Sequence, residues 1–293
     1  MTKTAWVFPG QGSQKIGMGM DLLELPAAKN KFEQAEEILG WSVPEICQSE
    51  SDQISRTLYT QPSMYVVESI LADLMRERGH EPDLVAGHSL GEYIALYTAG
   101  VFDWSAGLRL IKRRAELMDS AAGGMMAALI GFDREQLEQQ IQQTPDVVLA
   151  NDNSPAQAVI SGTPAAVEAV LSQVKSKLAI PLKVSGAFHS PLMAPAAAEF
   201  QEVLESVPFK SAQVPVLSNT EPIPAVDAAV LKQRLARQMT STVRWREIQQ
   251  RFADEGIERL VEIGPGNVLT GLIKRTIPKL VLSNISSLDD LPE

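Results

Sequence analysis

Cysteine is almost absent from this chain of 293 residues, and aromatic residues make up only 5% of it. The single cysteine, Cys47, excludes an internal disulfide and is typical of a reducing compartment. No apolar run approaches the ~18 residues that a membrane span needs. Residues 5–8 read as an early strand, so no signal peptide is expected. We therefore expect a cytoplasmic protein that does not enter a membrane.

Positive charge is also in short supply, with 26 Lys and Arg residues against 36 Asp and Glu residues. The resulting net charge of -10 argues against non-specific nucleic-acid binding, which relies on a basic surface. With 45% apolar and 21% charged residues, the composition is ordinary for a globular enzyme. The length allows one large domain or two modest ones.

The most informative segment that is present is residues 87–92, GHSLGE, a G-x-S-x-G pattern centred on Ser89. An apolar run precedes it at residues 84–86, and an amphipathic stretch follows at 92–100. Strand, sharp turn and helix form the context of a nucleophile elbow, in which the glycines let the backbone turn tightly around the serine. The alternative is an ordinary Gly-Ser turn between a strand and a helix.

Around this segment, predicted strands alternate with predicted helices. The strands are residues 5–8, 84–86 and 259–263. The helices are residues 27–39, 64–77 and 105–121 and a segment that begins at 268. This alternation predicts an α/β fold with a parallel sheet covered on both faces. Functional groups gather at the carboxyl ends of such strands, where residues 10–12, Ser89 and residues 264–266 would lie.

The middle of the chain has a different pattern. Strands are predicted at residues 125–130, 147–150, 158–161 and 180–185, with helices at 134–143 and 164–178. The order β-α-β-β-α-β predicts a ferredoxin-like small domain over 124–187, inserted into a large domain formed by 1–123 and 188–293. Glycines at both joins, Gly123, Gly124 and Gly186, look like hinges. The alternative is that these elements extend the main sheet.

A serine nucleophile needs a base, and the chain has three histidines. His88 is adjacent to Ser89, so its side chain is directed away from the serine side chain. His80 precedes the strand that leads to the elbow, and at ~3.3 Å per residue it would lie roughly 20 Å away. Elimination leaves His189, which lies where the small domain rejoins the large one.

Several motifs together resemble one family. They are residues 8–14 (FPGQGSQ), 17–19 (GMG), 87–92 (GHSLGE), 187–190 (AFHS) and 262–269 (EIGPGNVL). In this order they resemble the malonyl-CoA:acyl carrier protein transacylases of fatty acid synthesis, over nearly the whole chain. The resemblance implies an α/β-hydrolase-like parallel-sheet core with a ferredoxin-like insert, in agreement with the pattern of elements.

The resemblance also implies a reaction, in which malonyl passes from malonyl-CoA to Ser89 and then to the phosphopantetheine thiol of acyl carrier protein. His189 would carry the protons of this ping-pong scheme, which requires no metal and no cofactor of the enzyme's own. An elbow supplies the Leu90 N–H to the oxyanion, and by resemblance the Gln11 N–H is the second donor. A plain glycine turn remains the alternative for residues 10–12, whereas a phosphate loop lacks the required residues.

Three further assignments concern the substrate and the base. Arg114 aligns with the family's carboxylate-binding arginine, and a guanidinium can hold a carboxylate through two parallel hydrogen bonds. The alternative is a solvated basic helix face at residues 112–114. By resemblance to related acyltransferases, Leu90 and Phe188 accompany malonyl rather than methylmalonyl, unless Phe188 only packs the core. The resemblance also implies that the backbone carbonyl of Arg244, in a Val-Arg-Trp motif, orients His189.

The carrier protein is expected to dock near Lys274 and Arg275, with Lys183 as a further candidate, because a local basic patch can attract an acidic partner. We expect a monomer. Two other functions remain open on the sequence. One is a serine thioesterase or hydrolase, which normally has an acidic residue between the serine and the histidine in the chain. The other is a non-catalytic carrier-protein-binding subunit, which would have lost Ser89, His189 or Arg114.

Overall fold

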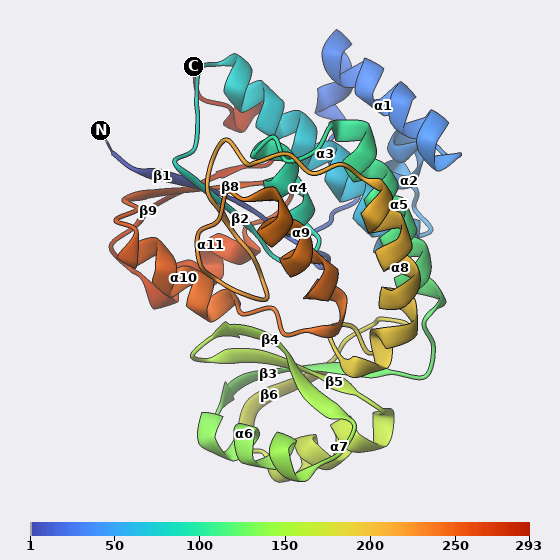
Figure 1. Cartoon of the computed structure of the whole chain (residues 1–293), viewed down its shortest axis with the longest axis vertical. Coiled ribbons are helices and arrows are strands. Elements are labelled where there is room, and N and C mark those ends of the chain that lie inside the picture. Colours follow the sequence, from blue (N-terminus) through green and yellow to red (C-terminus); the bar gives the residue numbers. More distant parts are fainter. Residues whose placement is uncertain (1) are drawn as a thin grey trace.

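A parallel sheet forms the centre of the molecule, whose computed structural model describes residues 2–293. Within this range the sheet has five strands in the order β7-β2-β1-β8-β9, all parallel (Figure 1). Their bounds are β1 Thr4–Phe8, β2 Leu84–Gly87, β7 Val216–Leu217, β8 Arg259–Ile263 and β9 Val281–Ile285. The parallel sheet predicted from the alternation of strands and helices is confirmed.

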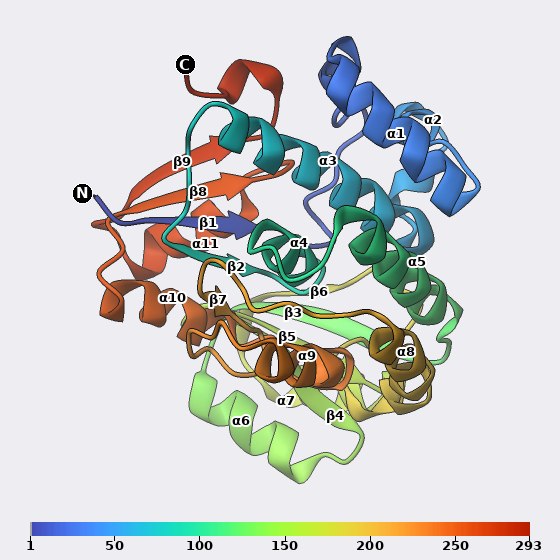
Figure 2. The same cartoon turned by 45° about the horizontal axis from the view of Figure 1, so that its top comes forward.

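Helices cover both faces of this sheet, because side chains of alternate residues in each strand point to opposite faces. Trp6 and Phe8 of β1 pack in the cluster that includes α3, α4 and α5, whereas Ala5 and Val7 pack with α10 and α11. Figure 2 shows α3 and α11 on opposite sides of β1 and β2. The bounds of these helices are α3 Thr57–Glu77, α4 Gly91–Thr98, α5 Trp104–Ser120, α10 Trp245–Asp254 and α11 Val268–Thr276.

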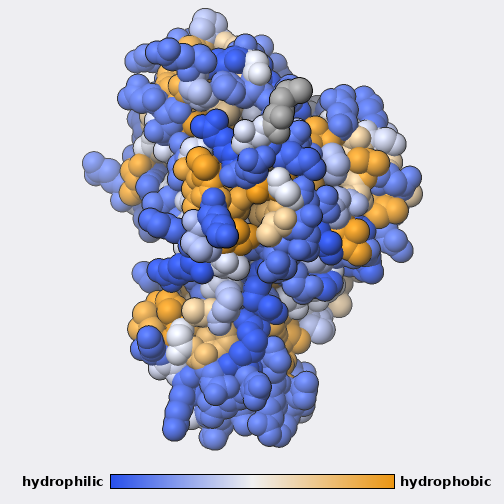
Figure 3. All heavy atoms as spheres, turned by 90° about the vertical axis from the view of Figure 1, so that its left-hand side faces the viewer, coloured by the Kyte–Doolittle hydropathy of each residue, from blue (hydrophilic) through white to orange (hydrophobic). Residues whose placement is uncertain are grey.

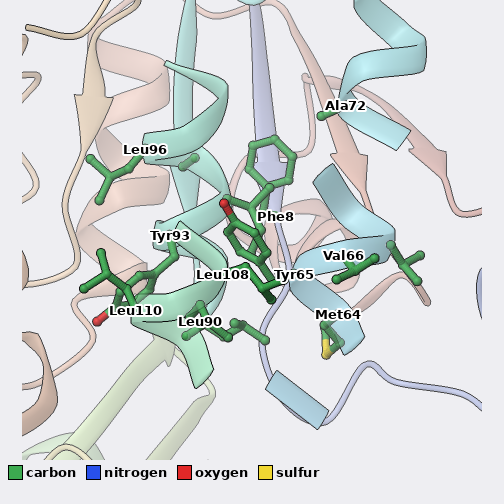
Figure 4. Packing of buried hydrophobic residues seen from close by; sticks show 14 of the residues in the cluster. Phe8, Met64, Tyr65, Val66, Ala72, Leu90, Tyr93, Leu96, Leu108 and Leu110 are labelled. Atoms are coloured by element: carbon green, nitrogen blue, oxygen red, sulfur yellow. The ribbon is translucent and has the colours of Figure 1, made fainter. Parts of the chain in front are cut away.

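The larger apolar core lies directly behind the elbow. In Figure 4, Phe8 and Tyr65 lie between the start of α4, with Leu90 and Tyr93, and Met64 of α3. All five are buried. Four further helices pack around this core: α1 Pro26–Leu39, α2 Val43–Gln48, α8 Ala194–Ser206 and α9 Ala228–Arg237. The elbow is thus supported by this buried core.

A second sheet lies apart from the first, below it in Figure 1. Its four strands within the described residues are antiparallel, in the order β4-β5-β3-β6. The elements follow the predicted β-α-β-β-α-β order: β3 Met125–Phe132, α6 Arg134–Gln143, β4 Val147–Ser154, β5 Gln157–Gly162, α7 Pro164–Gln173 and β6 Ser176–Pro181. Side chains of α6 and α7 form one apolar cluster with this sheet.

The predicted bounds of two elements in this region were wrong. The last strand covers Ser176–Pro181, and α7 already ends at Gln173. The hydrophobic spacing was misleading because β6 is an edge strand whose apolar side chains, such as Leu178, are exposed.

A seam of hydrogen bonds holds the small sheet against the large part. Asp152 N–H donates to the Val243 carbonyl (3.0 Å), and Val243 N–H donates to the Ala150 carbonyl (2.8 Å). The Asp152 carboxylate also accepts hydrogen bonds from Arg134 and Arg246.

The face of the molecule in Figure 3 is mainly hydrophilic, with separate hydrophobic patches, and it narrows where the two parts meet. Among the helices of residues 2–293, none combines the length and the apolar character needed to cross a membrane.

Candidate active site

The sharp turn after β2 places Ser89 at the carboxyl end of the sheet. Ser89 has a φ of 53°, in the left-handed region that a serine rarely adopts. Glycines make the turn possible, because a Cβ on Gly91 would lie 2.0 Å from the Phe8 carbonyl oxygen and one on Gly87 would lie 1.9 Å from Gly91. The segment therefore has the strand–turn–helix geometry of a nucleophile elbow, with α4 starting at Gly91.

His189 lies against the serine hydroxyl. Its Nε2 is 2.8 Å from Ser89 Oγ, and its Nδ1 is 3.0 Å from the carbonyl oxygen of Gln238. A carbonyl only accepts, so the proton is on Nδ1 and Nε2 is free to accept the serine proton. Burial and the nearby Arg114 cation lower the pKa of His189 to about 3. The imidazole is therefore neutral at physiological pH, as a general base must be.

The carbonyl that contacts His189 is not the predicted one. The carbonyl oxygen of Arg244 accepts the N–H of Ile248 (3.1 Å) in the first turn of α10 and has no contact with the histidine in residues 2–293. The Arg244 side chain forms an ion pair with Glu247 and donates to the Thr220 carbonyl. Gln238 replaces it because the short helix at Gln238–Thr240 directs that carbonyl toward the site.

Arg114 reaches the same hydroxyl from α5. Its Nη2 donates to Ser89 Oγ (3.0 Å), and its Nη1 donates to the side-chain oxygen of Gln61 (2.6 Å). The side chain is 1% exposed, and its guanidinium lies over the ring of Tyr93. No carboxylate within residues 2–293 forms an ion pair with it, and its Nε has no hydrogen-bond partner. Burial lowers the pKa of this guanidinium.

The two neighbouring basic residues are directed elsewhere. Lys112 donates to the carbonyl of Ile38, and Arg113 pairs with Glu116 and Glu199. The solvated-face interpretation therefore describes Arg113, whereas Arg114 alone enters the site.

Two backbone N–H groups border the nucleophile. Gln11 and Leu90 both line the pocket at Ser89, and in the described part of the chain neither backbone N–H donates a hydrogen bond. The close approach of the two loops depends on Gly10, where a Cβ would lie 2.5 Å from the His88 carbonyl oxygen. The Gln11 side chain is held by Thr57 Oγ1 (2.9 Å).

The pocket itself is small, about 80 Å³, and lies between the two sheets. Phe188 lines it and is 5% exposed, so its side chain both packs the core and borders the site. The small sheet contributes Met126 and Asn151 to the wall of this pocket, and the segment after β6 contributes the apolar residues Leu182 and Val184. Lys274 and Arg275 lie in the last turn of α11, outside the residues that line this pocket.

The other two histidines lie away from the serine hydroxyl. The His88 ring nitrogen Nε2 is 2.8 Å from Asn153 Oδ1, and the ring packs edge-on against Trp245. His80 lines a different and larger pocket, of about 180 Å³, with Thr4 and Arg259 at the starts of their strands. Ser283 also lines that pocket, but in residues 2–293 no hydrogen bond joins it to His80, so the greater size does not make this pocket the better candidate.

Sequence reasoning missed four polar residues around the site: Gln61, Glu92, Asn219 and Gln238. All four are buried. Three of them lie outside the motifs quoted above, and glutamine or asparagine in a helix or loop carries no signal of its own. Glu92 is the last residue of GHSLGE, and its position in a motif was the one available clue.

Comparison with known proteins places this geometry in context. A family model described as an acyl transferase domain matches residues 5–291. The malonyl CoA-acyl carrier protein transacylase of Synechocystis sp. is 58% identical over 289 residues, which cover 99% of each chain. The crystal structure of the malonyl-CoA:ACP transacylase of Synechocystis sp. superposes with a TM-score of 0.97 over 99% of each chain.

A structure of a type II PKS acyl-carrier protein in complex with its malonyl-transacylase is 36% identical. It superposes with a TM-score of 0.93 and covers 99% of this chain and 98% of that one.

Proposed function

The chain belongs to the acyl transferase domain family, and from this premise we propose that it is the acyltransferase that moves malonyl from malonyl-CoA to acyl carrier protein. The carrier protein's phosphopantetheine thiol is the acceptor, and the product supplies fatty acid synthesis. The relatives that match over their full length support both substrates.

One observation carries the choice of substrate: the buried Arg114 guanidinium donates to Ser89 Oγ and has no carboxylate partner in residues 2–293. A buried cation without an anion is costly, and a substrate carboxylate would supply that anion. Acetyl-CoA would leave the cation unpaired, so the site discriminates against it. A thioesterase for neutral acyl chains would have no use for this arginine.

The reaction follows from the contacts of Ser89. His189 Nε2 accepts the hydroxyl proton as Oγ attacks the thioester carbonyl carbon. The carbon–sulfur bond then breaks, and coenzyme A leaves with that proton as its thiol. In the second half the carrier thiol gives its proton to His189 and attacks the malonyl-serine ester. Ser89 regains its proton, and the malonyl thioester of the carrier protein departs.

The negative oxygen of each tetrahedral intermediate is stabilised by the unused N–H groups of Gln11 and Leu90. Donors of this kind contribute about 10²–10³ in rate each. Phe188, at the wall of the pocket, crowds an α-methyl group and so favours malonyl over methylmalonyl. The enzyme needs no cofactor of its own.

The remaining parts of the proposal concern setting. The elbow at the end of a central parallel strand supports an α/β-hydrolase-like core, with residues 124–187 as the inserted small domain. The enzyme acts as a cytoplasmic monomer. The basic pair Lys274 and Arg275, in the last turn of α11, receives the acidic surface of the carrier protein, with Lys183 as a further contact.

The first test is intact-protein mass spectrometry with equal malonyl-CoA and acetyl-CoA, followed by holo acyl carrier protein. We expect a malonyl adduct on Ser89 that moves onto the carrier protein. An adduct released as free malonate before the carrier is added would indicate a hydrolase, and the absence of any adduct would indicate a binding subunit.

A further inference from the structure

Glu92 is a buried carboxyl beneath the nucleophile, 1% exposed and in the first turn of α4. Its Oε2 accepts hydrogen bonds from the side-chain nitrogen of Gln238 (2.7 Å) and from the backbone N–H of Asn219 (3.2 Å). Burial raises the pKa of this carboxyl to about 7, and these two donors act against that rise. Glu92 therefore connects the elbow with two segments that reach it from distant parts of the chain.

Gln238 contacts Ser89, Arg114 and His189 as well as Glu92. Its side-chain nitrogen donates to Glu92 and to the Ser89 carbonyl (2.8 Å), so both of its N–H bonds are used. Because two acceptors hold the nitrogen, the amide oxygen faces Arg114 Nη2 (3.1 Å). Its backbone carbonyl accepts from His189. The side-chain amide of Gln238 thus positions the guanidinium, and its backbone carbonyl positions the imidazole.

Asn219 holds the turn itself. Its Oδ1 accepts the Ser89 N–H (2.7 Å), and its Nδ2 donates to the Gly87 carbonyl (2.6 Å). Ser89 is in the left-handed region, and surrounding contacts are what keep a residue in such a conformation. The backbone of Asn219 is in turn held by Glu92.

We propose that Glu92 is a positioning residue, which acts through Gln238 on Arg114 and His189 and through Asn219 on the turn at Ser89. It touches none of the atoms that react. With respect to the identity of the acyl group, this inference rests on the proposed malonyl transfer.

The test compares three variants for acyl loading per active site, counted by intact mass. In Glu92→Ala we expect loading from malonyl-CoA to fall about 10²-fold, because small misplacements of reacting groups have effects of this size. Glu92→Gln keeps an acceptor oxygen in the same place and should stay within about tenfold of wild type. Glu68→Gln is the matched control, since Glu68 is another fully buried carboxyl, on α3, without a hydrogen-bond partner in residues 2–293. It should load at the wild-type rate.

The second readout is the ratio of malonyl to acetyl loading, which loss of stability alone would not change. Displacement of Arg114 in Glu92→Ala should lower this ratio about tenfold. In Glu92→Gln, where the acceptor oxygen is retained, the ratio should stay near that of wild type. A folded Glu92→Ala with wild-type rate and ratio would overturn the proposal. If Glu92→Ala does not fold, Glu92→Asp keeps the charge but shortens the reach, and an unchanged rate and ratio in that variant would overturn it equally.

A neutral fluorophosphonate probe separates this inference from the proposed function, because it reacts with Ser89 and needs no carboxylate site. We expect slower labelling in Glu92→Ala than in Glu68→Gln. A wild-type enzyme that is labelled but not loaded by malonyl-CoA would refute the proposed function, while the labelling rates still decide the role of Glu92. Equal labelling in the two variants would count against it.

Discussion

His88 and His189 both lie close to the nucleophile elbow, and only His189 contacts the nucleophile. His88 is next to Ser89 in the chain, yet it bonds to Asn153 and packs on Trp245. His189 is 100 positions later, and its Nε2 is 2.8 Å from Ser89 Oγ. A sharp turn directs consecutive side chains apart, so His88, the residue next to Ser89, contacts Asn153 of the small sheet instead of the serine hydroxyl. The base comes from the segment that returns from that sheet.

The largest expected effect is on the histidine that contacts Ser89. His189→Ala should lower the rate of malonyl loading by ~10²–10⁴, the usual contribution of general-base catalysis. His88→Ala serves as the control and should stay within about tenfold of wild type. Single-turnover loading followed by intact mass measures both. Similar losses in the two variants would show that the comparison is wrong.

Arg114 and its neighbour Arg113 allow a second comparison, which concerns the choice of acyl group. Arg114→Ala should reduce the ratio of malonyl to acetyl loading by ~10–10², because hydrogen bonds to charged groups contribute about 1.5–3 kcal/mol. Some acetyl transfer should remain. Arg113→Ala, one position earlier and paired at the surface with Glu116 and Glu199, is the matched control. Competition between malonyl-CoA and acetyl-CoA gives the ratio. An unchanged ratio in Arg114→Ala would show that Arg114 does not bind the malonyl carboxylate.

The structural histidine should show its effect in stability. His88→Ala removes the partner of the buried Asn153 side chain and should lower the free energy of unfolding by about 1–3 kcal/mol. Urea denaturation measures this change. A stability equal to that of wild type would mean that the contact with Asn153 contributes nothing to holding the small sheet.

The pH dependence of stability tests the burial of His189. The pKa of His189 is about 3 when folded, whereas an unfolded histidine titrates near 6.5. The unfolded chain therefore binds more protons between these values, and stability is lost as the pH falls from about 6.5 toward 3. His189→Asn should lose less stability over that range. Identical urea midpoints against pH for the two proteins would contradict the shift.

The smallest expected effect is at Arg244. Its carbonyl is used inside α10 and its side chain pairs with Glu247, so Arg244→Gln should change loading by less than about twofold. Gln238 is the residue whose carbonyl meets His189. If Arg244→Gln failed to form the acyl-enzyme, Arg244 would be needed to orient His189 after all.

Much of this arrangement could be predicted. The strand before Ser89, the helix after it and the β-α-β-β-α-β order of the small sheet all follow from hydrophobic spacing and from glycine. The two-residue strand β7 was missed because it is too short to show any periodicity. The edge strand β6 was misplaced because its apolar residues face solvent. Hydrophobic patterns indicate which residues are buried. They mispredict a strand when the strand is very short or when its apolar side chains are exposed.

The turn at Ser89 and the chemical identity of the reacting groups follow from the sequence alone. Glycine at 87 and 91 makes the turn at Ser89 possible, and elimination among three histidines leaves His189. The residues that position Ser89 and His189 through hydrogen bonds are known only from the folded structure. Every residue carries the same backbone carbonyl, so no side chain reveals that Gln238 would meet His189. Likewise, the hydrogen bonds of Glu92 form between segments that only folding brings together.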